Sequence, residues 1–172
     1  MYLFNNILKF IIIFCSISIS SASQKIKSEK CDTPYFVSLK VKAAVARIGP
    51  GKQYKIAWKY VVKFFPLLVI AKYDTWRQVK DLSNSISWVK QSQLSVKRYL
   101  VVKKNNSILF EKPNTNSKNI VKLGNNVILK PIKIIDEDWC YVQVFKSDKP
   151  TNIKGYIQRE NIYGLLNNEI TI

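Results

Sequence analysis

Short segments in which apolar and polar residues alternate run through much of the chain. Residues 36–42 (FVSLKVK) show this alternation clearly, and it is the pattern of a β-strand with one buried face. The stretch 48–52 (IGPGK) that follows is typical of a loop. No segment has the three-and-four-residue spacing of an amphipathic helix. The pattern therefore predicts an all-β protein, with further strands at 67–73, 76–79 and 86–89.

Two aromatic signatures occur twice in the same order, which indicates an internal repeat. DTWRQV at 74–79 is echoed by DEDWCYV at 136–142, and SWVKQSQL at 87–94 is echoed by GYIQRENI at 155–162. The repeat predicts two units, residues 36–99 and 100–164, preceded by an arm at 24–35 and followed by a tail at 165–172. Units of about 60 residues built from short strands are typical of small barrels or a sandwich.

These motifs resemble the bacterial SH3-like domain and, more closely, a family of exported bacterial proteins that carry it in tandem. The resemblance implies two tandem small SH3-like β-barrels that bind a ligand and do not catalyse a reaction. Ser87 and Phe64 stand where such domains usually have glycine, so the turn at Phe64 is expected to be strained or relaxed, with an exposed ring. The resemblance rests on TPYFVSLK at 33–40, RIGPG at 47–51, AW at 57–58, DTWR at 74–77, WV at 88–89, QSQL at 91–94, GYIQ at 155–158 and YG at 163–164.

The N-terminus has the features of a secretory signal peptide. One lysine and no acid precede the apolar run at 10–19, and the small residues Ser21, Ala22 and Ser23 follow it. A run of this length is shorter than the roughly 18 to 20 residues that span a bilayer, which disfavours the alternative of an uncleaved anchor. We predict removal of residues 1–23 after Ser23 and a periplasmic or secreted protein.

Export would leave two cysteines, Cys31 and Cys140, in a compartment where disulfides persist. A Cys31–Cys140 disulfide would join the N-terminal arm to the second unit. The alternation in 139–144 also places Cys140 with Val142 and Val144 on one strand face, where a small apolar side chain fits a core. Both interpretations stay open from the sequence.

The charge is strongly positive and unevenly distributed. The chain has 28 Lys and Arg, 11 Asp and Glu and no His, a formal net charge of +17. Without histidine, Ser-His-Asp and Cys-His hydrolases and His-ligated metal sites are excluded. Residues 36–99 hold 13 basic and 2 acidic residues, whereas 100–172 hold 11 and 7. The excess of lysine over arginine disfavours specific nucleic-acid binding and is also what A/T-rich codon usage would produce.

Aromatic residues lie among the cations of the first unit, and a basic groove with aromatic walls suits an anionic polymer or a carboxylate-bearing peptide. Strand parity places Trp76 and Gln78 outward, opposite Val79, although a tryptophan can also cap a small barrel as a half-buried lid. The same parity places Trp139, Tyr141 and Gln143 outward in the second unit, while Tyr60 and Tyr73 are expected in the core. The candidate ligand-binding residues are Tyr54, Trp58, Lys72, Trp76, Arg77, Trp88 and Lys90.

The sequence offers no catalytic constellation, and neither a metal ion nor another cofactor is expected. The one tight carboxylate cluster, Asp136 to Asp138, falls at a predicted turn, where Asp is favoured for backbone reasons. We therefore expect an exported, non-catalytic binding or scaffolding module of the cell envelope whose ligand, by resemblance, is peptidoglycan or its peptides. One alternative is electrostatic association with anionic membrane surfaces, with Phe64, Phe65 and Leu68 as apolar contacts. The other is an adaptor for an envelope protein.

Overall fold

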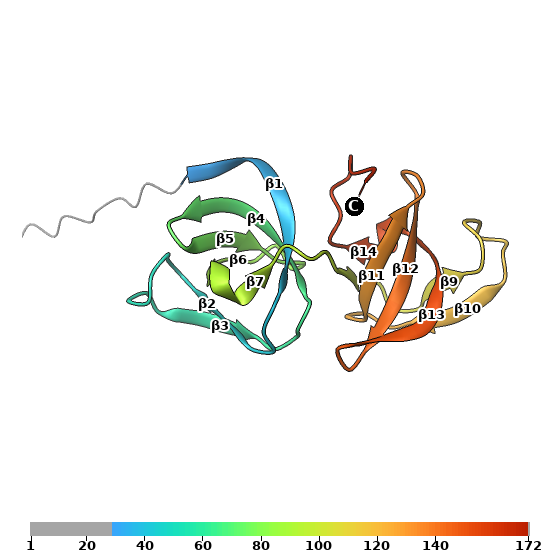
Figure 1. Cartoon of the computed structure of the whole chain (residues 1–172), viewed down its shortest axis with the longest axis horizontal. Helices are drawn as coiled ribbons and strands as arrows, with labels where there is room; N and C mark the ends of the chain where they lie inside the picture. The colour runs from blue at the N-terminus through green and yellow to red at the C-terminus, as the bar shows by residue number, and fades with distance from the viewer. Residues whose placement is uncertain (1–28, 172) are drawn as a thin grey trace, which may run out of the picture.

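The computed structural model of the chain describes residues 29–171 and is built almost entirely from β-strands (Figure 1). Helical structure in this range is limited to two 3₁₀ turns, η1 (Gln91–Gln93) and η2 (Arg159–Asn161). The all-β prediction is confirmed. The expected signal peptide at 1–23 lies outside the described residues.

The described strands form two seven-stranded sheets with antiparallel pairing (Figure 1). The first sheet has the order β3-β2-β6-β5-β4-β1-β7 and the second β10-β9-β13-β12-β11-β8-β14, so each number in the second is seven higher. The first sheet contains β1 (Glu29–Leu39), β2 (Ala44–Arg47), β3 (Ile56–Tyr60), β4 (Pro66–Tyr73), β5 (Trp76–Lys80), β6 (Ile86–Lys90) and β7 (Leu94–Ser95). The second contains β8 (Leu100–Val102), β9 (Ser107–Phe110), β10 (Asn119–Leu123), β11 (Ile128–Ile134), β12 (Trp139–Lys146), β13 (Lys149–Gln158) and β14 (Ile162–Tyr163).

The predicted strands of the first sheet are found at nearly the expected bounds, but β1 is longer. It begins at Glu29, inside the segment expected to be an arm, and its pairing with β4 shifts register between Lys30 and Tyr35. The predicted loop at 48–52 consists of bends and turns. Because of this extension, Tyr35 is part of a strand of the first sheet.

Each sheet encloses its own core, because alternate residues along its strands point to one shared side. The first core contains Val37, Leu39, Ala44, Ala46, Leu67, Val69, Val79 and Val89, all buried. The second contains Leu100, Val102, Leu109, Leu123, Leu129, Ile134, Cys140, Val142, Val144, Ile157 and Ile162.

An aromatic cluster joins the two sheets. The ring of Phe64 stacks on Tyr99 with centroids 4.3 Å apart, and both rings meet the edge of Phe145. Phe64 is half-buried, so the expectation that its ring is exposed was wrong. Its φ of 67° lies in the left-handed region, so of the two outcomes expected for this turn, strained or relaxed, the backbone is strained, at a position where glycine would not be.

A second contact between the two sheets is made by β14, the last strand. The rings of Phe36 and Tyr163 meet edge to face at 5.0 Å, and the Tyr163 hydroxyl donates a hydrogen bond of 2.9 Å to the Lys80 carbonyl in the first sheet. Gly164 has a φ of 122°, and a Cβ there would lie 2.7 Å from the Tyr99 carbonyl oxygen. The two sheets are therefore closely packed against each other at this junction.

Candidate functional site

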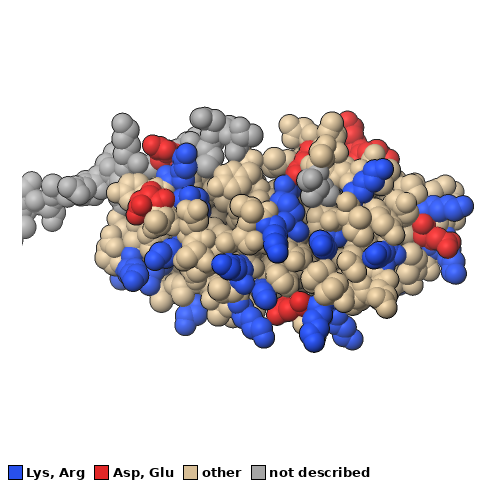
Figure 2. Space-filling model, viewed as in Figure 1, with Lys and Arg blue, Asp and Glu red and all other residues tan. Residues whose placement is uncertain are grey.

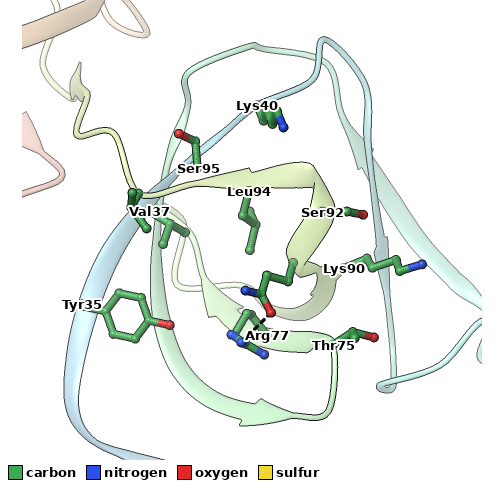
Figure 3. Close-up of a pocket in the computed structure, with 11 residues that line it drawn as sticks. Tyr35, Val37, Lys40, Thr75, Arg77, Lys90, Ser92, Leu94 and Ser95 are labelled. Atoms are coloured by element: carbon green, nitrogen blue, oxygen red, sulfur yellow. Dashed lines mark hydrogen bonds between the residues drawn. The ribbon is translucent and has the colours of Figure 1, made fainter.

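The first sheet carries an open pocket of about 480 Å³. Its wall comes from β1, the turn between β4 and β5, the start of β5, the end of β6, η1 and β7. Figure 3 shows Tyr35 on one side and Lys90 on the other, with Leu94 between them. The lining residues are Tyr35, Val37, Lys40, Thr75, Arg77, Lys90, Gln91, Ser92, Leu94, Ser95 and Val96.

Local hydrogen bonds fix the shape of this pocket. Asp74 takes a φ of 45° in the tight turn between β4 and β5, and the Gln91 backbone N–H donates to the Thr75 carbonyl at 2.8 Å. The Gln93 side chain accepts a hydrogen bond of 2.9 Å from the Val45 backbone N–H. These hydrogen bonds connect η1 to the turn between β4 and β5 and to β2. The position of η1, and with it the shape of the pocket, is therefore fixed.

Three cations line the pocket. The Arg77 guanidinium donates to the Asp74 and Trp76 carbonyls at 2.9 Å and to Gln91 Oε1 at 2.7 Å, the bond drawn in Figure 3. No carboxylate is among the lining residues, and within the described part of the chain none forms an ion pair with Lys40, Arg77 or Lys90. One carboxylate, that of Asp74, lies beside the pocket and accepts a hydrogen bond of 3.4 Å from the Thr75 hydroxyl. The three cations outnumber it, so the pocket suits an anion.

The rest of the wall is apolar or uncharged. Tyr35 is exposed at the mouth, and Leu94 and Val37 supply aliphatic surface. Hydroxyl groups of Thr75, Ser92 and Ser95 lie at its edges. A ligand with a carboxylate and a small apolar body would match this mixture.

Among the residues expected at the site, the pocket brings together Arg77 and Lys90. Trp76 and Trp88 are 8% and 6% exposed. Trp76 therefore lies on the strand face opposite Val79, as the parity predicted, but it is buried there and not open to a ligand from solvent. Neither tryptophan belongs to the first core cluster; both are covered on the other side of their strands. Trp139, also expected outward, is buried with its ring against Phe110.

The remaining expected residues lie elsewhere on the first sheet. Trp58 is half-buried against the first core and meets Tyr60 edge to face at 6.0 Å. The Tyr54 ring packs over the backbone of Gly49, where any side chain would collide with it. Lys72 is exposed and lies 3.7 Å from Glu29. Their role in binding stays a prediction.

Two tyrosines assigned to the core differ in their environment. Tyr60 packs against the first core, donates its hydroxyl hydrogen to Asp81 at 3.1 Å, and burial raises its pKa to about 12. Tyr73 is 39% exposed, so its assignment to the core was wrong. It follows the last buried position of β4, where the strand leaves the protein interior.

The pocket also contains residues that the sequence reasoning missed, chiefly Tyr35 and Lys40. Both belong to the segment TPYFVSLK that carried the family resemblance, so the signal was present. Tyr35 was missed because residues 24–35 were expected to form an arm. Lys40 lies inside the first unit but has no aromatic neighbour in the sequence, so the interleaving of cations with aromatic residues did not indicate it.

A second cavity, of about 640 Å³, lies where the second sheet meets the first. Phe36 and Leu68 of the first sheet form part of its wall, and the C-terminal segment forms another part. Its full lining is Phe36, Leu68, Lys103, Glu137, Asp138, Arg159, Glu160, Ile162, Tyr163, Leu165, Leu166, Asn167 and Asn168.

The acidic cluster beside this cavity has a backbone role. Asp136 Oδ1 accepts hydrogen bonds from the backbone N–H groups of Asp138 and Trp139, at 2.8 and 2.7 Å, which is the turn function expected of Asp. Among residues 29–171, no three Cys, Asp or Glu side chains are grouped as a metal ion would require.

Cys140 is fully buried in the second core and forms no disulfide within the described part of the chain. Burial raises its pKa to about 12, because a thiolate would be poorly solvated there. The position agrees with a small core residue, one of the two interpretations of the sequence. The side chain of Cys31 lies outside the described part of the chain, so the Cys31–Cys140 disulfide stays a prediction.

The apolar contacts suggested for a membrane surface are not available as a patch. Phe64 is in the junction, Phe65 packs against the first core, and Leu68 lines the second cavity. In the part of the chain that is described, no helix has the length and apolar character needed to cross a membrane. Figure 2 shows Lys and Arg side chains spread over the face in view, with fewer acidic groups.

Comparison with known proteins identifies one domain. Residues 40–95 match the family model of the bacterial SH3 domain. No curated protein matches the chain. Among solved structures, NlpC2 from Trichomonas vaginalis has a TM-score of 0.34 and 9% identity over 77% of this chain and 49% of that one. NlpC1 from the same organism has 0.35 and 8% over 76% and 45%. The chain spans about half the length of either protein.

Proposed function

Because residues 40–95 are a bacterial SH3 domain, we propose that the chain is an exported, non-catalytic binding module that holds peptidoglycan peptides in the basic pocket of this domain. The observation that supports it most is the combination of Lys40, Arg77 and Lys90 around a pocket without a lining carboxylate. Stem peptides carry carboxylates, and the fixed pocket loses little entropy when a ligand binds.

The proposal extends to the rest of the chain. The second sheet has the strand order of the first, so the second unit is proposed as another SH3-like barrel in tandem. The N-terminal apolar segment with its small-residue boundary is proposed as a cleaved signal peptide that delivers the protein to the envelope.

Co-sedimentation of residues 24–172 with purified peptidoglycan sacculi tests the proposal. The expected result is pelleting that persists in part at high salt and is competed by soluble muropeptides, because apolar contacts of the pocket are not screened by ions. Anionic liposomes serve as the parallel arm. Pelleting with liposomes alone, lost at high salt, would overturn the proposal in favour of membrane association, and pelleting with neither would favour an adaptor.

The export part is tested separately by the intact mass of secreted protein. The mass should correspond to a chain that lacks residues 1–23. A secreted protein that retains this segment would contradict the proposed cleavage.

A further inference from the structure

The pocket of the first sheet and the cavity of the second occupy the same place in the two sheets. Lys40 N–H donates to the Gln93 carbonyl at 2.8 Å, as Lys103 N–H donates to Asn161 at 2.9 Å. Likewise, Gln91 N–H donates to Thr75 at 2.8 Å, as Arg159 N–H donates to Asp138 at 2.7 Å.

Because of this correspondence, each of six residues that line the first pocket has an equivalent residue in the lining of the second cavity. The side chains at several of these equivalent positions differ in charge. Where the first pocket has uncharged Thr75, Gln91 and Ser92, the second cavity has Asp138, Arg159 and Glu160. The shared lining positions are Lys40 with Lys103, Thr75 with Asp138, Gln91 with Arg159, Ser92 with Glu160, Leu94 with Ile162 and Ser95 with Tyr163.

The C-terminal tail of the chain forms part of the wall of the second cavity. Residues 165–168 of the C-terminal tail line it, and Arg159 donates to the Leu166 and Asn167 carbonyls at 2.9 and 3.2 Å. The tail is therefore bound at the edge of this cavity through its main-chain carbonyl groups.

A carboxylate completes the attachment of the tail. Arg98 binds Glu169 through two hydrogen bonds of 2.7 and 2.9 Å, and these side chains are only 21% and 13% exposed. Such paired, charge-assisted bonds are the strong form of carboxylate recognition. Arg98 lies four residues before Val102 as Tyr35 lies four before Leu39, so Arg98 corresponds in sequence to Tyr35. The Arg98–Glu169 pair is not part of the lining of the second cavity and attaches the tail next to it.

The first pocket has no such tail. After Ser95 and Val96 the chain continues through Arg98 and Tyr99 into the second sheet. Of its cations, Lys40 at the end of β1 corresponds to Lys103, whereas Arg77 on β5 and Lys90 on β6 have no cationic counterpart in the lining of the second cavity. It thus retains the cavity and positive charge but has no carboxylate among its lining residues.

We propose that the first pocket binds a peptide bearing a free carboxylate, supplied by another molecule, at the place where the second unit attaches its own segment 165–169 next to the corresponding cavity. Arg77, Lys40 and Lys90 receive the carboxylate, while Tyr35 and Leu94 contact the peptide's apolar part. This inference rests on the proposed function and narrows its ligand class to peptide ends or side chains with a free carboxyl group.

The test is calorimetric titration of residues 24–172 with a stem peptide released from peptidoglycan, alongside the same peptide with its carboxyl groups converted to amides. The amide should bind roughly 10- to 100-fold more weakly, as expected for the loss of a charge-assisted hydrogen-bonded contact. Equal affinity for the two peptides would overturn the inference.

Substitutions of the pocket lysines test whether the peptide binds in this pocket. Lys40→Gln and Lys90→Gln should each weaken binding of the free-carboxylate peptide by about fivefold or more at moderate salt, while Lys59→Gln, the same charge change at an exposed position outside the pocket, should leave it unchanged. Arg77→Lys is preferred to alanine because Arg77 also holds the turn at Asp74. An equal effect of Lys59→Gln would overturn the pocket assignment.

The two proposals fail in different ways. Pelleting with sacculi that is unaffected by Lys40→Gln and Lys90→Gln would retain the proposed function and reject the carboxylate pocket. Binding of the free-carboxylate peptide that depends on these lysines, without pelleting of sacculi, would retain the pocket and reject peptidoglycan as the target.

Discussion

Phe64 stacks on Tyr99 across the junction with the ring planes 18° apart, although its own backbone is held in the left-handed region. The equivalent position in the second sheet is Asn126, whose φ is 62° and whose N–H donates to the Val102 carbonyl as Phe64 N–H donates to Leu39. Asparagine tolerates this conformation better than phenylalanine does. Phe64 thus accepts local strain and contributes to the contact between the sheets.

Phe64→Asn is expected to separate these two effects. The variant relieves roughly 1 kcal/mol of backbone strain but loses ring contacts with Tyr99 and Phe145 worth about 0.5 to 1.5 kcal/mol each. Scanning calorimetry should resolve one cooperative transition of the parent into two. Tyr73→Asn, at an exposed ring outside the junction, should leave the profile unchanged, and a single unaltered transition in Phe64→Asn would contradict the junction's role.

The attachment of the C-terminal tail should depend on pH through Glu169. Burial alone would raise its pKa, but hydrogen bonds from Arg98 and the Leu166 N–H outweigh this, so the pKa is lowered from its ordinary 4.5. The pair therefore stabilises the folded chain fully above about pH 4.5, and this stabilisation decreases as the pH falls through the lower, folded-state value.

Glu169→Gln provides the measurement. The variant should have a lower melting temperature than the parent at pH 7, and the difference should shrink as the pH falls below 4.5 and through the lower, folded-state pKa, where the parent's carboxylate becomes protonated. Glu111→Gln, at an exposed glutamate without an ion pair in the described structure, serves as control. A pH-independent difference would show that charge is not the cause.

Gly155 is expected to be sensitive to substitution in the second sheet. A Cβ at this position would lie 2.7 Å from the Phe110 carbonyl oxygen and 2.8 Å from Leu109 Cγ, so β9 and β13 would have to separate. Gly155→Ala should destabilise the protein by about 1 to 3 kcal/mol in urea unfolding. Gly124→Ala is the matched control, since its Cβ would have open space up to Asn105 at 3.8 Å; equal losses would reject the steric explanation.

Cys140 should resist alkylation in the native protein. Its pKa of about 12 leaves little thiolate at pH 8, and the side chain is fully buried. Iodoacetamide followed by peptide mapping without reductant should label Cys140 only after unfolding. Recovery of a peptide pair linked through Cys31 and Cys140 would instead establish the disulfide, and rapid native labelling would contradict the burial.

The strands of the first sheet were predictable because alternation is a local property. The segment 76–79 lies within β5, and parity correctly separated Trp76 from Val79 and the first core. Parity reports which side of a strand a residue faces but not what covers that side, and so the burial of Trp76 was missed. Motifs that carried the resemblance also located the bacterial SH3 domain at 40–95.

Local alternation could not predict the junction or the attachment of the C-terminal tail next to the second cavity. Tyr163 and Lys80 are 83 positions apart, and Arg98 and Glu169 are 71 apart. No local pattern specifies such pairs. The first pocket was half predicted, through Arg77 and Lys90, because its remaining cation, Lys40, reaches it only through the pairing of β1 with β4 and β7.

The hydrogen bond from Tyr163 to Lys80 also has a consequence for the order of assembly. Whenever the chain emerges from its N-terminal end, in synthesis or in translocation, β1 to β7 are complete once residue 95 has appeared, and this unit has its own core. The junction has to wait for residues 145 and 163, and the tail is attached last, at Glu169. For that interval Phe64 has its strained backbone and can stack on Tyr99, but it lacks the contact with Phe145 that completes the junction.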